Sequence, residues 1–185
     1  MNNGTSNSVV LGLTLARNSI DNPLYTRSGS SFQLSLHMTP PVSLFRDKNW
    51  EELYKTNTAE SKKEMYKWIE YWKLRFKSRT YTPLVNPDGQ YTLVLMTRAD
   101  FGLLGSYNKW LKSPFETFYV GGDGMTGSYT YATETIGLRG YDNGAFTPWG
   151  KEGYAYARLG LELHFPFMLQ PTTTIYGLVF AEGGN

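Results

Sequence analysis

The feature that most constrains this chain is an alternation between residues 72 and 79, in which every second side chain is cationic and those between them are apolar up to Phe76. Successive side chains of a β-strand point to opposite faces of the sheet. The alternation predicts a strand with an apolar and a cationic face: Trp72, Leu74 and Phe76 on the first, and Lys73, Arg75, Lys77 and Arg79 on the second. In a transmembrane β-barrel such faces meet lipid and a wet lumen. A soluble sandwich would seldom place four cations in a row on one short strand.

The two faces of this strand lead to different expectations for substitutions. A charge on a lipid-facing position is costly, so we expect Leu74→Arg to hinder membrane insertion, while Lys73→Leu should be tolerated. The cationic row is expected to solvate the lumen wall. Attraction of anionic substrate segments is the alternative role for these side chains.

Similar alternation in five other segments predicts about six antiparallel strands of a larger transmembrane β-barrel. These segments lie near residues 11–15, 32–38, 93–100, 159–165 and 173–181. The connections alternate short and long, in this order: around Asp21, 40–66, 86–89, 102–152 and 166–171. Short periplasmic turns and long extracellular loops are typical of outer-membrane barrels. Residues 1–185 are thus expected to form one partial barrel domain with extracellular loops at about 40–66 and 102–152, because a closed barrel needs about eight strands.

The composition removes several classes of function. The chain has no cysteine, which excludes disulfides, thiolate metal sites and a cysteine nucleophile. His37 and His164 lie far apart and lack the spacing of metal ligands. A formal net charge of +2 gives no signal for nucleic acid. We therefore expect a protein that is not an enzyme, with no catalytic residues, no metal, no cofactor and no nucleic-acid partner.

The start of the chain, from Met1 to Thr5, is polar and does not have the pattern of a signal peptide. No stretch approaches the roughly 20 apolar residues of a membrane helix. If the protein is exported, the signal must lie elsewhere, so we interpret the chain as a fragment of a longer parent.

The segment between residues 40 and 72 mixes helical and aromatic signals. Asn49 can cap a short surface helix, with Glu52 reaching back to it, and helix or loop is expected up to about residue 66. Trp68, Tyr71 and Trp72 are expected to lie in the aromatic belt at the membrane interface. Ordinary core aromatics are the alternative.

Two motifs occur in the long Gly- and Tyr-rich segment: Phe118-Tyr119-Val120-Gly121-Gly122 and Leu138-Arg139-Gly140-Tyr141. In this order they resemble the large extracellular loop of the BamA superfamily, which includes two-partner secretion transporters. Residues 123–127, between the motifs, look like BamA proteins of Bacteroidetes. The resemblance extends along nearly the whole chain, including the turn around Asp21 and the strands that contain Glu162 and Glu182.

The resemblance implies that the loop folds back into the barrel and that Arg139 pairs with Glu162 and Glu182 on the inner wall. Alternation supports Glu162, which lies on the polar face of its strand. Glu182 shares a face with Leu178 and Phe180, which would point it outward unless a nearby bulge corrects the direction. Alternation therefore supports the Arg139–Glu162 pair, whereas the Arg139–Glu182 pair rests on the resemblance alone.

The chemistry of the second motif fits a structural anchor. A planar guanidinium that is always charged binds carboxylates in a two-pronged manner. Gly140 permits a tight turn, and Tyr141 can pack while its hydroxyl stays hydrogen-bonded. The alternative is that Arg139 is a solvated loop arginine.

Two other groups of residues resemble functional sites, but neither indicates catalysis or ligand binding. The glycines of the Gly121-Gly122-Asp123-Gly124 run are typical of a phosphate-binding loop, but no Lys-Ser/Thr pair or predicted helix follows them. Arg158, Glu162 and His164 are expected to face inward and could mimic an acid–base site. Lumen walls of barrels commonly carry such groups for solvation, which is the interpretation we prefer.

The function implied by the resemblance is the assembly and insertion of other β-barrels in the Gram-negative outer membrane. Its implied partners are outer-membrane lipid and, through other parts of the parent chain, assembly-complex subunits and unfolded barrel substrates. A two-partner-secretion-type transporter of the same superfamily is the first alternative. A soluble β-barrel that binds a small ligand is the second.

Overall fold

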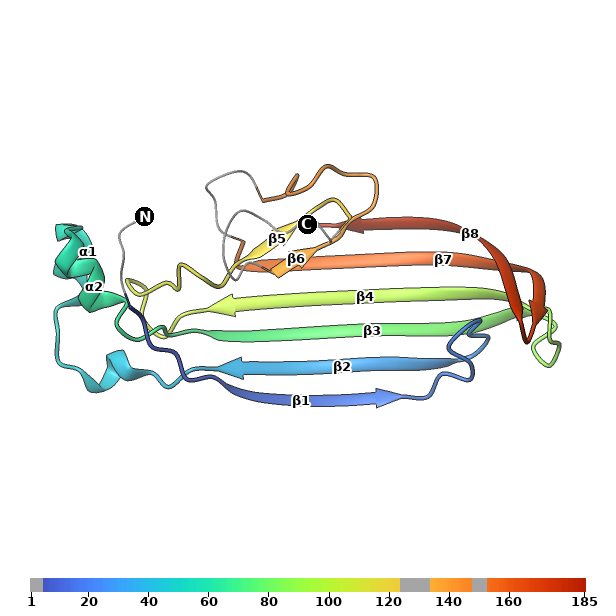
Figure 1. The fold of residues 1–185 in the computed structure, drawn as a ribbon, viewed down its shortest axis with the longest axis horizontal. Helices are drawn as coiled ribbons and strands as arrows, with labels where there is room; N and C mark the ends of the chain where they lie inside the picture. Colours follow the sequence, from blue (N-terminus) through green and yellow to red (C-terminus); the bar gives the residue numbers. More distant parts are fainter. Residues whose placement is uncertain (1–4, 124–133, 148–152) are drawn as a thin grey trace.

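The main element of the structure is a six-stranded antiparallel sheet with the order β1-β2-β3-β4-β7-β8 (Figure 1). The computed structural model describes residues 5–123, 134–147 and 153–185. The sheet contains β1 (Leu11–Asn18), β2 (Gly29–Met38), β3 (Trp72–Val85), β4 (Leu93–Gly105), β7 (Ala155–Gln170) and β8 (Thr173–Gly184). The predicted all-β fold with six antiparallel strands is confirmed. The sheet is open, with β1 and β8 at its edges.

One face of the sheet is apolar and exposed. Residues that are paired across an antiparallel sheet share a face, and the register aligns Leu13, Leu36, Leu74 and Leu103 on consecutive strands. Leu13 is 61% exposed and Leu103 is 47% exposed. Leucines without a protein partner on this face are what a lipid-facing surface requires.

The other face is polar. Its rows include Ala16, Gln33, Lys77, Asp100 and Arg158, which are paired in that order across β1, β2, β3, β4 and β7. The structure therefore places the leucine rows and the charged rows on opposite faces, as the alternation predicts.

The connections lie at two ends of the sheet, short ones at one end and long ones at the other (Figure 1). The short turns follow β1, β3 and β7. The first long connection carries η1 (Val42–Phe45), α1 (Trp50–Thr56) and α2 (Ala59–Met65). This arrangement of connections agrees with the predicted alternation of their lengths.

The predicted cap of the first helix is present. The side chain of Asn49 accepts a hydrogen bond from the backbone N–H of Glu52, at 3.3 Å, so α1 begins at Trp50. Glu52 also reaches back, and its carboxylate accepts from the Asn49 amide at 3.3 Å. A second cap, Thr58, accepts from the backbone N–H of Ser61 and starts α2, so the segment expected as helix or loop up to about residue 66 is helical from Ala59 to Met65.

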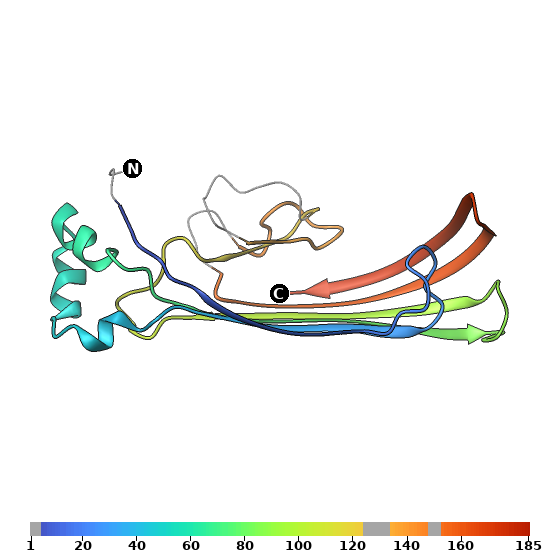
Figure 2. The same cartoon turned by 60° about the horizontal axis from the view of Figure 1, so that its bottom comes forward.

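The second long connection folds back over the concave, polar face of the sheet (Figure 2). It contains two short strands, β5 (Phe118–Val120) and β6 (Glu134–Ile136), which pair in parallel. No strand in this segment is predictable from the sequence, because three-residue strands carry no periodic signal. Its predicted start at residue 102 was wrong, since β4 continues to Gly105.

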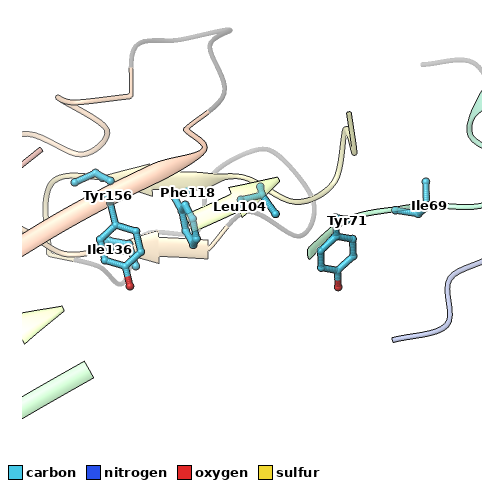
Figure 3. Close-up of a cluster of buried hydrophobic side chains, with 7 residues drawn as sticks. Ile69, Tyr71, Leu104, Phe118, Ile136 and Tyr156 are labelled. Atoms are coloured by element: carbon cyan, nitrogen blue, oxygen red, sulfur yellow. The ribbon is translucent and has the colours of Figure 1, made fainter. Parts of the chain in front are cut away.

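A cluster of buried side chains joins this loop to the sheet (Figure 3). Phe118 is fully buried and packs edge-to-face on Tyr156 of β7, with ring centroids 4.8 Å apart. Tyr71 belongs to the same cluster and is 6% exposed. The prediction that Tyr71 lies in an interfacial belt was therefore wrong, because it shares the parity of inward-facing Lys73. The belt positions of Trp68 and Trp72 remain predictions.

Among the described residues, no helix is both long enough and apolar enough to cross a membrane. The polar start, residues 1–4, and the Gly124–Gly127 part of the motif region lie outside the described residues. Expectations about those segments therefore stay predictions.

Candidate functional site

In the described part of the loop, the guanidinium of Arg139 binds two carboxylates of the barrel wall. Its Nε donates to Glu182 Oε2 at 2.7 Å, and its Nη2 donates to Glu162 Oε1. The Glu182 side chain is 1% exposed and that of Glu162 is 9% exposed, while Arg139 retains 35%. We call these three residues the Arg139 anchor. Burial lowers the pKa of Arg139, but the two carboxylates raise it by more, so the guanidinium stays charged.

The ring of Phe180 completes the contact with Arg139. The guanidinium carbon lies 3.8 Å from the ring centroid, a stacking arrangement that stabilises a cation by about 0.5–2 kcal/mol. Glu162 pairs with Phe180 and Gly160 pairs with Glu182 across β7 and β8, so all four face inward. The prediction that Phe180 points outward was wrong, and Glu182 needs no bulge near it. The register shift in this strand pair lies instead between Pro166 and Met168.

A second guanidinium links the anchor to the neighbouring strands. Arg158 on β7 donates its Nε to Glu182 Oε1, and its Nη1 lies 3.8 Å from Asp100 Oδ2 on β4. Glu182 thus accepts from two arginines, one from the loop and one from the wall. A nearly buried carboxylate that is shared in this way is stabilised only while both cations remain in place.

His164 supports the other carboxylate. Its Nε2 lies 3.1 Å from Glu162 Oε2, while Glu162 Oε1 accepts from Arg139. The predicted inward cluster of Arg158, Glu162 and His164 is therefore present, and these groups interact with the anchor rather than standing free in the lumen.

The backbone geometry explains the paired glycines of the first motif. Gly121 has φ +128° and Gly122 has φ +73°, both in a region that other residues rarely adopt. A side-chain carbon on Gly121 would lie 2.5 Å from the carbonyl oxygen of Asp142. This close packing lets Leu138 donate its N–H to Gly122 O at 2.9 Å, which ties the second motif to the first.

The remaining motif residues shape the tip of the loop. Leu138 is fully buried directly before Arg139. Gly140 has φ +87° with open space where a side chain would be, so its conformation alone favours glycine. Tyr141 packs edge-to-face on Phe146, with centroids 4.8 Å apart, and stays 48% exposed. Backbone geometry and packing together present Arg139 to the wall.

A second set of ion pairs, not predicted from the sequence, holds the other end of the loop. Lys73 pairs with Glu116 and lies 3.8 Å from Glu134, and Arg75 pairs with Glu134. The Lys73 side chain is 8% exposed, and its ammonium lies 5.6 Å from the Phe118 ring. These side chains, which we call the β3 anchor, bind the loop instead of solvating an open wall. The alternation in the sequence identified only the cations of this set, Lys73 and Arg75.

In the described ranges, no three His, Asp, Glu or Cys side chains are grouped as metal ligands. What the geometry can do is hold a loop: it combines charged hydrogen bonds, a cation–π contact and a buried aromatic core at two places on one face.

An antiparallel sheet with one exposed apolar face, and with a long loop anchored on its polar face, defines this chain as part of a β-barrel wall. The family model described as the Omp85 superfamily domain matches residues 1–185. The chain therefore belongs to the Omp85 superfamily, whose members are outer-membrane proteins of Gram-negative bacteria. No match was found among curated proteins.

Proposed function

We propose that this chain forms part of the barrel of a BamA-type factor, which assembles and inserts other β-barrels in the Gram-negative outer membrane. The superfamily covers both assembly factors and two-partner-secretion transporters. The resemblance of residues 123–127, between the two loop motifs, to BamA proteins of Bacteroidetes favours assembly over secretion. Further strands of the parent chain would close the barrel, because an open sheet edge in lipid leaves backbone groups unpaired.

The observation that carries this proposal is the contrast between the two faces. Leu13 and Leu161 lie on the uncovered face at 61% and 51% exposure, while Lys73, Arg75 and Arg139 on the other face are bound to carboxylates. Burying leucine surface in lipid is favourable by about 25 cal/mol per Å². The same sheet in water would expose that surface without compensation.

The Arg139 anchor is proposed to act as a structural element of the machine. It holds the loop inside the lumen, so that the wall keeps its shape while the barrel opens or thins the membrane beside its seam. The chain would work without a catalytic residue or cofactor and without nucleic acid. Lipid would contact its leucine face, and assembly subunits and unfolded barrel substrates would bind other parts of the parent chain.

The experiment uses the full-length protein in cells depleted of the native copy. Arg139→Ala should reduce the folded, heat-modifiable fraction of several unrelated outer-membrane barrels, because an unanchored loop leaves Glu162 without its guanidinium partner and Glu182 with Arg158 alone. Arg79→Ala is the matched control, since Arg79 is exposed on the same face and has no ion pair within the described ranges. It should behave as wild type.

The outcomes distinguish the candidate functions. A general loss of folded barrels supports assembly. Normal barrels together with loss of one secreted exoprotein would support the transporter instead. Wild-type behaviour of Arg139→Ala in both assays would contradict the role of the anchor.

A further inference from the structure

A side chain from the short connection between β1 and β2 reaches across the sheet to strands nearer its other edge. Tyr25 is 4% exposed, and its hydroxyl donates to the carbonyl oxygen of Thr92 at 2.7 Å. The carbonyl oxygen of His164 lies 3.3 Å from the same hydroxyl. Because the sheet order places β3 between β2 and β4, this residue spans several strands to reach β7. A turn that only joined its two neighbours would not need such a contact.

The turn that presents Tyr25 is held by its own hydrogen bonds. Asp21 accepts from the backbone N–H groups of Arg27 and Ser28, at 2.9 and 3.3 Å. Burial raises the pKa of Asp21, but these donors lower it by more, so the carboxylate remains ionised. Burial raises the pKa of Tyr25 above its usual value, which keeps the hydroxyl protonated as a donor. The turn is therefore an ordered platform for the tyrosine.

A continuous series of side-chain contacts leads from Tyr25 to Glu162. The Tyr25 ring meets the edge of Tyr176 on β8, with centroids 5.4 Å apart. Tyr176 lies 5.6 Å from the His164 ring, and Tyr81 flanks the same imidazole at 6.4 Å. His164 then contacts Glu162 at 3.1 Å. The imidazole is thus held between two aromatic rings, one of which rests on Tyr25.

We propose that Tyr25 is a positioning residue that couples the β1–β2 turn to the Arg139 anchor. Its ring supports Tyr176 and its hydroxyl fixes the backbone at His164, so the Glu162 carboxylate is presented to Arg139. Loss of the Tyr25 contacts therefore weakens the Arg139 anchor, which lies at the other end of this series of contacts. This inference rests on the proposed function, because it assumes that the anchor holds the loop in the barrel.

The test measures opening of the loop in the full-length protein in outer membranes. The reporter is Val120→Cys, a near-isosteric change at a loop residue that is 3% exposed, with any cysteine outside these 185 residues replaced. Its labelling by a maleimide reports exposure of the loop core. Tyr25→Ala should raise the labelling rate about fivefold or more, as expected for losing at least one buried hydrogen bond and the ring contact. Tyr25→Phe keeps the ring and should raise it less.

The matched control is Tyr91→Ala. Tyr91 lies in another turn at the same end, is 50% exposed, and its hydroxyl accepts from the N–H of Leu169 at 3.3 Å. It does not contact the His164 ring. The labelling rate of this variant should stay within about twofold of wild type. The heat-modifiable fraction of each variant shows whether the barrel has folded, and labelling rates are compared for the folded fraction.

A double-mutant cycle separates coupling from general destabilisation. In an Arg139→Ala background, Tyr25→Ala should add little, because the anchor is already lost. A full, independent increase in that background would overturn the inference, and so would wild-type labelling of Tyr25→Ala alone. If Arg139→Ala itself left labelling unchanged, the anchor and this inference would both fail. If Arg139→Ala raised the labelling rate and Tyr25→Ala did not, the inference about Tyr25 would be contradicted and the anchor would stand.

Discussion

At the scale of single residues, Glu182 is the side chain on which the anchor depends most. It is 1% exposed and accepts from both Arg139 and Arg158, whereas Glu162 pairs with one arginine and one histidine. Replacing a carboxylate by an amide of the same shape removes the charge and keeps the packing. The two glutamates therefore allow a direct comparison of their contributions.

We predict that Glu182→Gln lowers the free energy of unfolding by about 3 kcal/mol or more, since it leaves two guanidinium groups short of a partner. Glu162→Gln should cost roughly half as much, because Arg139 keeps Glu182. Urea unfolding of the full-length protein in bilayers measures both. Equal costs, or a larger cost for Glu162→Gln, would contradict the shared role of Glu182.

The residues of the anchor were only partly predictable from the sequence. The motif located Arg139, and alternation located Glu162, because both signals are local. The inward direction of Phe180 was missed, since an apolar side chain was assumed to face lipid, whereas an aromatic face also stabilises a cation. The carboxylates of the β3 anchor, Glu116 and Glu134, lie in a segment without periodicity, so only the folded loop brings them to Lys73 and Arg75.

At the scale of elements, the two faces of the strands should respond differently to the same substitution. Leu161 lies on the exposed apolar face of β7, and Ala16 lies on the polar face of β1. Leu161→Arg should cost about 2–4 kcal/mol if the position is near the bilayer midplane. Ala16→Arg should cost less than about 1 kcal/mol, because its side chain reaches water. The folded fraction after insertion into liposomes measures both, and equal insertion would overturn the assignment of faces.

The β3 anchor changes an expectation for the cationic row. Lys73→Leu was expected to be tolerated, but Lys73 is nearly buried and pairs with Glu116, so its loss leaves a carboxylate without its cation. We now predict that Lys73→Leu destabilises the closed loop by about 1–3 kcal/mol, seen as faster proteolysis of the loop. Lys77→Leu, at an exposed position of the same row, is the control and should match wild type. Identical proteolysis of both variants would contradict the second anchor.

The elements themselves were largely predictable because their signals are periodic or local. Alternation located the six strands, and the Asn49 cap located α1. The strands extend further than predicted, with β7 reaching 16 residues, because pairing with neighbours continues past the end of the apolar pattern. The parallel β5–β6 pair exists only through its packing on the sheet, and no sequence pattern of three residues specifies that.

At the scale of the whole molecule, the chain is one section of a barrel wall, and its second long connection is bound to the polar face. The six strands present leucines on one side and charged residues on the other, and the long loop lies over one side of the sheet (Figure 2). Two anchors at different strands, together with the aromatic cluster around Phe118, fix the loop at several points. Membership of the Omp85 superfamily follows from the match over the full 185 residues, and a face of exposed leucines is what a barrel wall in contact with lipid requires.

The most direct test of this account is the environment of single spin labels in the full-length protein in bilayers. Labels at Leu13, Leu34 and Leu161 should collide with dissolved oxygen more than with a water-soluble nickel reagent, because these side chains contact hydrocarbon. Labels at Ala16 and Gln33 should show the opposite preference, since they face the aqueous interior. Nickel-accessible labels at the three leucine positions, with oxygen-rich surroundings at Ala16 and Gln33, would contradict the central claim.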